Sequence, residues 1–216
     1  MTSRDPVATP APGPSPAPAR SATWGTSIAD PGPLGLAGFA AATFYLSAVN
    51  ADLLSSSVES GVFGLAIFYG GIVQLLAGMW EFTKGNTFGA VAFSSFGAFW
   101  LAFWWLATKS VPEMVAAKAS TSDINHAVGT FLLIWTIFTA YMFIASMRTS
   151  GAVSAVFLAL TLTFLFLCIG AYANSTGWTK TGGWLGLITA VLAWYASFAA
   201  VTNSTFKRVV LPVFPL

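Results

Sequence analysis

Long apolar runs alternate with short polar stretches along this chain of 216 residues. Each run is roughly 20 residues long, the length that an α-helix needs to cross the hydrocarbon core of a bilayer. The strict alternation of polar and apolar side chains that marks the strands of an outer-membrane barrel is missing from the sequence. The pattern therefore predicts six transmembrane helices, over residues 34–53, 62–80, 88–108, 127–146, 153–173 and 183–201.

The composition leads to the same class of protein. Hydrophobic residues make up 56% of the chain and charged residues only 7%, whereas a soluble domain carries about 25% charged residues. Such a chain cannot cover a water-facing surface. We expect an all-α integral membrane protein whose helices satisfy their own backbone hydrogen bonds in lipid.

The first 29 residues differ from the rest, because they consist mainly of Pro, Ala, Ser and Thr. A segment of this kind buries too little apolar surface to fold, so residues 1–29 are expected to be disordered. The segment lacks the apolar core of a cleavable signal peptide, and the first span is expected to serve as the targeting signal. Residues 30–206 are predicted to form one transmembrane domain, followed by a short tail over residues 207–216.

Lys and Arg are unevenly divided between the two ends of the predicted bundle. Six spans place both termini on one side, together with the second–third and fourth–fifth loops. That side carries six cations: Arg4, Arg20, Lys84, Arg148, Lys207 and Arg208. The other side carries three: Lys109, Lys118 and Lys180. Because cytoplasmic loops are enriched in Lys and Arg, both termini are predicted to be cytoplasmic, with the protein in the plasma (inner) membrane.

Few residues in the spans could carry catalytic chemistry. No Asp, Glu, Lys, Arg or His falls well inside a predicted span, and the nearest is Glu81, at the end of the second. Ionisable residues at membrane depth normally mark proton relays, ion sites and catalytic centres. His126 and Cys168 are the sole histidine and cysteine, too few for a His-rich or multi-cysteine metal site. We expect no enzymatic activity, no cofactor, no metal and no nucleic-acid partner.

Uncharged polar side chains, in contrast, occur in most spans. Ser and Thr can bond back to their own helix, but the amides of Asn50 and Gln74 are costly to bury in lipid. They are expected to face other helices or a water-filled path, which would suit a small, weakly polar solute. The candidate pore-lining residues are Thr43, Ser47, Asn50, Gln74, Ser94, Thr161, Thr163 and Asn174.

One segment carries a more specific signal, the decapeptide Asp30-Pro31-Gly32-Pro33-Leu34-Gly35-Leu36-Ala37-Gly38-Phe39. Pro33 suits the first turn of a helix, and the Asp30 side chain can accept a hydrogen bond from an unpaired N–H of that turn. The decapeptide also closely resembles the N-P-A-P-L-G-L-x-G-F signature of the acetate uptake transporter family, of the succinate–acetate permease type. Four later stretches resemble the same family, over residues 67–71, 77–82, 85–89 and 93–100.

The resemblance implies a homohexamer in which each six-helix subunit has its own pore. The pore would carry acetate and related small carboxylates, with succinate a further candidate, as a channel or a proton symporter. It also implies a narrow hydrophobic constriction built from a Phe, a Tyr and a Leu. The matching positions here are Phe39, Phe96 and Leu160.

Two residues depart from the family pattern. Phe96 stands where the family has Tyr, which removes a hydroxyl from the expected constriction. Asp30 stands where the signature has Asn, which keeps a capping oxygen but adds a negative charge.

Two further questions stay open at this level. Glu81 is the best candidate for proton coupling, although it could equally pair with Lys84 or cap neighbouring backbone. The alternative function is an acetate- or ammonium-linked membrane sensor or an ammonia export protein. A sensor would need an output module, which the Pro/Ala-rich tail does not offer.

Overall fold

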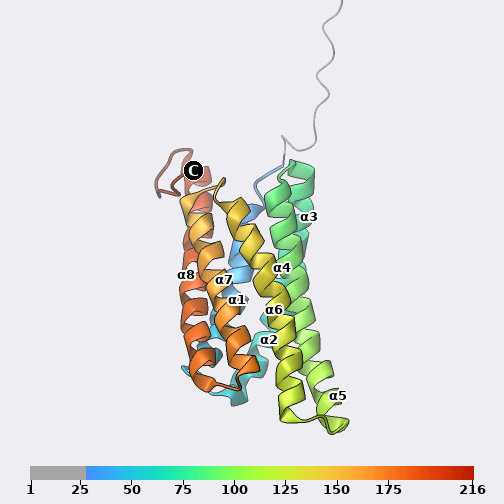
Figure 1. Cartoon of the computed structure of the whole chain (residues 1–216). Coiled ribbons are helices and arrows are strands. Elements are labelled where there is room, and N and C mark those ends of the chain that lie inside the picture. Colours follow the sequence, from blue (N-terminus) through green and yellow to red (C-terminus); the bar gives the residue numbers. More distant parts are fainter. Residues whose placement is uncertain (1–27) are drawn as a thin grey trace, which may run out of the picture.

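The structure of the chain, a computed structural model, describes residues 28–216 (Figure 1). Arg4, Arg20 and nearly all of the predicted tail over residues 1–29 therefore lie outside the described residues. Within residues 28–216, regular structure is helical, and the only β-type pairing is an isolated bridge between Ser150 and Pro215. Six helical stretches are long and apolar enough to cross a membrane, which confirms the predicted number of spans.

Three of the six stretches are single helices in the second half of the chain: α6 (Thr121–Ser146), α7 (Gly151–Tyr172) and α8 (Thr176–Phe206). The first stretch is α1 (Gly32–Asn50). The second joins η2, a 3₁₀ turn (Ser56–Gly61), to α2 (Val62–Gly64), to η3, a π-helix (Leu65–Val73), and to α3 (Gln74–Lys84). The third joins α4 (Thr87–Trp105) to η4, a π-helical turn (Leu106–Ser110), and to α5 (Val111–Ala116).

Several helices extend beyond the apolar runs that predicted them. The second stretch begins at Ser56 and the third continues past Lys109 to Ala116. Hydropathy falls where polar residues begin, whereas a helix ends where its terminal backbone groups find other partners. The predicted cap at the start of α1 is confirmed, because the Asp30 Oδ1 atom accepts a hydrogen bond of 3.0 Å from the Gly32 N–H.

The six stretches form a closed ring (Figure 1). α1 packs against α8 on one side and against η3 and α3 on the other. α7 lies between α6 and α8, and α4 packs against both α3 and α6. Buried aromatic and aliphatic side chains from α1, α4, α6 and α7 meet inside the ring. This arrangement gives the bundle a central axis along which a solute path can run.

Close backbone contact fixes the position of α1. A Cβ atom on Gly38 would lie 2.5 Å from the carbonyl oxygen of Tyr69 in η3. A Cβ atom on Gly70 would lie 2.9 Å from both the Ala42 Cβ and the Trp100 Cδ1 atoms. Only glycine permits this approach of α1, η3 and α4, because small residues let membrane helices touch backbone to backbone.

Candidate functional site

The structure brings together the three residues that the sequence placed at a constriction. Phe39 of α1, Phe96 of α4 and Leu160 of α7 are each 3% exposed, and all three line a small cavity of about 20 Å³ in the middle of the bundle. The ring centroids of Phe39 and Phe96 are 5.5 Å apart. Three helices far apart in sequence thus place apolar side chains at one point.

Phe96 lies inside a cluster of aromatic rings. Its ring centroid is 5.3 Å from that of Phe138 and 6.0 Å from that of Phe157. Trp135 and Phe164 also contact it, with centroids 6.1 and 6.5 Å away. The side chain therefore contributes only apolar surface to the small cavity.

Two larger cavities lie on either side of this point. The first, which we call the Asn50 chamber, has a volume of about 230 Å³. It shares Phe39 and Leu160 with the small cavity. The second, the Lys84 chamber, has a volume of about 260 Å³ and shares Leu36, Ala92, Phe93 and Phe157 with the small cavity. The small apolar cavity therefore shares a wall with each of the two chambers.

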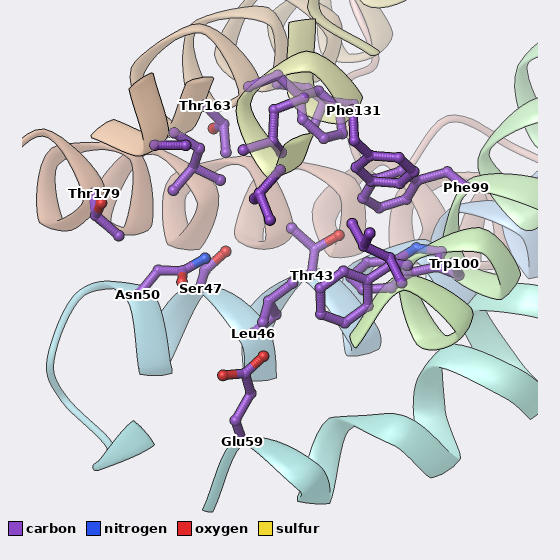
Figure 2. A pocket seen from close by; sticks show the side chains of 18 of the residues that line it. Thr43, Leu46, Ser47, Asn50, Glu59, Phe99, Trp100, Phe131, Thr163 and Thr179 are labelled. Carbon is purple, nitrogen blue, oxygen red and sulfur yellow. The ribbon is translucent and has the colours of Figure 1, made fainter. Parts of the chain in front are cut away.

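The Asn50 chamber is polar at one side and aromatic at the other. Figure 2 shows Ser47, Asn50, Glu59, Thr163 and Thr179 gathered on one side. Its other side holds aromatic rings, namely Phe99, Trp100 and Phe131. The lining thus changes from polar to aromatic along the chamber.

Four of the eight candidate pore-lining residues line this chamber: Thr43, Ser47, Asn50 and Thr163. Thr43 follows Phe39 by one helical turn, and Ser47 follows by one more, so they share one face of α1. The Thr43 Oγ1 atom is buried and has no hydrogen-bond partner among residues 28–216. The Thr163 hydroxyl bonds the Ala159 carbonyl at 2.8 Å and lies 3.2 Å from the Thr189 hydroxyl.

The other four candidates lie away from the three cavities described. Gln74 is 1% exposed within α3, and Thr161 bonds back to the Phe157 carbonyl at 2.7 Å. Ser94 packs against Gly78, where a Cβ atom would meet its hydroxyl. Asn174 follows the end of α7 with a positive φ of 47° and accepts a hydrogen bond from Asn125.

Glu81, which the sequence placed at the end of the second span, lies about one turn before the end of the second helical stretch. It lies inside α3 and is 1% exposed. The helix continues to Lys84, whose Nζ atom is 3.8 Å from the Glu81 Oε2 atom and 2.7 Å from the Asp30 Oδ1 atom. These three charged residues line the Lys84 chamber together. Asp30, which stands where the family signature has Asn, is therefore part of a charged cluster.

Sequence reasoning missed Glu59, which is the single charged residue among those lining the Asn50 chamber. It lies in η2, in a stretch that hydropathy assigned to a loop. It also missed the aromatic wall of that chamber, because Phe and Trp in a span are more often lipid-facing or packed. If the sequence analysis had started the second helix at Ser56, it would have placed Glu59 in the first turns of that helix.

Cations of residues 28–216 lie at both ends of the bundle. Lys84 lines the chamber at the end of the bundle where α1 begins, and Arg148 adjoins the α6–α7 loop at that end. Lys180 instead pairs with Asp52 beyond the end of α1, with 2.7 Å between Nζ and Oδ2. Within residues 28–216, no group of three or more His, Cys, Asp or Glu side chains gathers as a metal site.

Comparison with known proteins identifies the family. The family model described as the GPR1/FUN34/yaaH family matches residues 11–216. The chain belongs to this family. The family resemblance drawn from the decapeptide is thereby confirmed.

Some of the relatives similar to this chain have names that describe transport. The chain is 36% identical over 190 residues to the succinate-acetate/proton symporter SatP of Escherichia coli strain K12, covering 87% of this chain and 96% of that protein. It is 40% identical over 189 residues to ammonia transport outward protein 2 of Saccharomyces cerevisiae, covering 88% of this chain and 67% of that protein.

A solved structure of the family has the same fold. The structure of the bacterial acetate channel SatP matches with a TM-score of 0.78 at 35% sequence identity. The match covers 87% of this chain and 99% of that chain. The six-span, all-helical fold predicted from the sequence is therefore confirmed by both the structure and its neighbour.

Proposed function

We propose that this protein carries acetate and related small carboxylates across a membrane, through a path that joins the Asn50 chamber to the Lys84 chamber. Succinate is a further candidate substrate. The observation that carries the proposal is the pair of chambers separated by Phe39, Phe96 and Leu160 inside a six-span ring. The names of SatP and of its solved structure support the substrate class.

We infer that Phe39, Phe96 and Leu160 act as a hydrophobic constriction. Apolar constrictions can gate by dewetting, and they favour solutes that lose their water easily. Acetate presents a methyl group to such a ring and a carboxyl group to hydroxyls. The buried Thr43 hydroxyl, one turn from Phe39, can donate a hydrogen bond to that carboxyl group on the Asn50 side.

The charges of the chambers favour passage of the substrate as a neutral acid. The single charged side chain lining the Asn50 chamber is Glu59. The Lys84 chamber holds Asp30 and Glu81 around Lys84, which leaves an excess of negative charge when all three are ionised. An acetate anion would be repelled at both ends, whereas acetic acid would carry its own proton. Transport then has the stoichiometry of a proton symport without a titrating residue in the path.

The test is uptake of radiolabelled acetate into liposomes that contain the purified protein. We expect uptake above that of empty vesicles, after subtraction of passive diffusion, and competition by unlabelled short monocarboxylates. Liposomes with protein that take up no more acetate than empty ones would contradict the proposal. Phe39→Trp, which enlarges a side chain at the constriction, should reduce uptake in the same preparation.

Glu81 has a second possible role as a proton carrier, as the sequence suggested. Its burial beside Lys84 at the wall of a chamber fits either a carrier or a structural ion pair. Glu81→Gln separates the two roles. Under passage of the neutral acid, the variant keeps the pH dependence of uptake, whereas a carrier role requires that the dependence be lost.

Ammonia export is the second candidate function. It is favoured by the negative charge of both chambers, which attracts ammonium, and by the name of the yeast relative. Ammonia, like acetic acid, can cross an apolar constriction as a neutral molecule. The test measures the rate of ammonia release from preloaded vesicles and the rate of acetate uptake in the same preparation. Comparison of the two rates shows which substrate the protein prefers. A sensor role has no observation of this kind behind it.

We also propose a homohexamer in the plasma (inner) membrane, with both termini cytoplasmic and no enzymatic activity. Large apolar side chains cover the outside of the single bundle, for example Phe68 at 66% and Phe198 at 60% exposure. These side chains can face lipid or a neighbouring subunit. Native mass spectrometry of the purified protein tests the number of subunits, and protease accessibility in oriented vesicles tests the side of the termini.

A further inference from the structure

The last ten residues do not extend away from the bundle. Residues 207–216, which we call the C-terminal strap, leave α8 at Lys207, which has a positive φ of 55°. They then fold back across the end of the bundle where α8 ends (Figure 1). The bridge between Ser150 and Pro215 joins the strap to the loop before α7.

Hydrogen bonds hold the strap from two sides. On the α8 side, the Asn203 Oδ1 atom accepts from the N–H groups of Val210 at 2.7 Å and Leu211 at 3.0 Å, and its Nδ2 atom donates to the Leu211 carbonyl. The Tyr195 hydroxyl donates to the Pro212 carbonyl at 2.7 Å. These contacts fix the middle of the strap to the last turns of α8.

On the α7 side, the strap occupies the first N–H groups of the helix. The Gly151 N–H donates to the Phe214 carbonyl at 2.6 Å and the Ala152 N–H to the Val213 carbonyl at 3.3 Å. Val213 in turn lines the Lys84 chamber, next to Ala152 and Val153 of α7. The strap is therefore part of the chamber wall.

Hydrogen bonds rather than burial hold most of this segment, because several of its apolar side chains are exposed. Val209 is 79% exposed, Phe214 60% and Leu216 64%. The lipid-facing surface of α8 continues into them through the exposed Phe206. Such side chains are stable at the boundary between headgroups and acyl chains, where apolar groups can insert without a full transmembrane span.

Three cations accompany these apolar side chains. Lys207 and Arg208 begin the strap, and Arg148 precedes Thr149, whose carbonyl accepts from the Leu216 N–H. All three are exposed, and none forms an ion pair with another residue of the range 28–216. Cations at the membrane surface are attracted to anionic lipid headgroups.

We propose that the C-terminal strap binds the anionic headgroup layer of the membrane, and that this contact holds the strap in place as a wall of the Lys84 chamber. The first half of the proposal concerns lipid binding alone. The second half, the effect on the chamber, rests on the proposed transport function. Anionic lipid fits this surface because exposed basic side chains and exposed apolar side chains occur together at the end of α8, which is long enough to cross the membrane.

A fluorescent probe on the strap tests the lipid contact directly. Val209→Cys is made in a Cys168→Ser background and labelled with an environment-sensitive dye. The protein is reconstituted in vesicles of phosphatidylcholine alone or mixed with phosphatidylglycerol. We expect blue-shifted emission with phosphatidylglycerol, reversed by high salt. Each cation should change the affinity roughly fivefold.

Matched charge variants complete the test. Lys207→Gln combined with Arg208→Gln should abolish the shift. Lys109→Gln combined with Lys118→Gln removes two exposed, unpaired cations at the opposite end and should leave the shift intact. Identical emission in both lipids, or a shift that survives loss of Lys207 and Arg208, would overturn the proposal.

Acetate uptake in the same two lipids tests the coupling to the chamber. We expect faster uptake with phosphatidylglycerol in the parent protein, and no difference between the lipids in the Lys207/Arg208 variant. Tyr195→Phe, which loses the bond to Pro212, should lower uptake toward the phosphatidylcholine level. A blue shift with equal uptake in both lipids would overturn the coupling while lipid binding stands. No uptake in either lipid would refute the transport function instead, and the emission would still decide lipid binding.

Discussion

Phe39 and Phe96 lie ring against ring in the middle of the bundle, with 5.5 Å between their centroids. They come from α1 and α4, and Leu160 of α7 lines the same small cavity. Their rings are tilted by 55° to one another, an arrangement that aromatic pairs prefer to a face-to-face sandwich. The contact is the centre of the constriction that we propose between the two chambers.

Leu160→Ala should widen the small cavity and admit bulkier acids. A pocket discriminates one methylene by roughly tenfold or more, so the uptake ratio of propionate to acetate should rise about tenfold. The buried substitution should also lower stability by about 2–5 kcal/mol, which thermal unfolding in detergent measures. Leu158→Ala, on the exposed face of the same helix, is the control. An unchanged ratio would count against the constriction.

Phe96→Tyr should restore a hydroxyl at the constriction. The aromatic neighbours of Phe96 offer it no strong acceptor, so we expect a stability loss of about 1–3 kcal/mol. The hydroxyl can instead bond a passing carboxylate, and the uptake ratio of succinate to acetate should increase. Phe138→Tyr, at a ring that packs against Phe96 but lines none of the three cavities, should leave the ratio unchanged.

Gly38→Ala should separate α1 from η3. The added Cβ atom would lie 2.5 Å from the Tyr69 carbonyl oxygen, a backbone atom that cannot move aside cheaply. Overpacking of this kind costs about 1–3 kcal/mol. Gly64→Ala provides the control in the same region of the fold, since no atom lies within 4 Å of its added Cβ. Equal melting temperatures for the two variants would refute the close approach.

As the pH is changed, the rate of uptake should follow the concentration of neutral acetic acid. At fixed total acetate, the neutral acid falls about tenfold for each pH unit above its own ionisation range, and uptake should fall in parallel. Stopped-flow recording of internal pH measures this, because each acid molecule delivers one proton. Uptake that tracks the anion concentration instead would contradict passage of the neutral acid.

Much of the fold could be predicted from the sequence, because the spacing of apolar runs reports bilayer thickness directly. The constriction could not be derived in that way. Phe39, Phe96 and Leu160 look like any other apolar residues of a span, and only the resemblance to the family singled them out. Of the polar candidates, Thr43, Ser47, Asn50 and Thr163 share one chamber, whereas the hydroxyl of Thr161 turns back to its own helix.

Three features depend on long-range contacts that no local pattern contains. Glu81 was expected at the end of a span, but its burial depends on Gly32 and Gly89, where added Cβ atoms would lie 3.3 and 2.8 Å from its side chain. The π-helical turns of η3 and η4 leave no distinct signature in hydropathy. The strap looked like a free tail, because its partners Asn203 and Tyr195 belong to α8 and are identified only by geometry.

The volume of the small cavity between the rings also has a consequence for the rate of transport. A water molecule needs about 10–15 Å³ of such space, so the 20 Å³ between the chambers holds roughly one. Acetate is larger, so under the proposed constriction each crossing requires the rings to swing aside. In a close-packed interior one ring moves only when its neighbours yield. The turnover frequency is then governed by the rotational fluctuations of the whole aromatic cluster around Phe96.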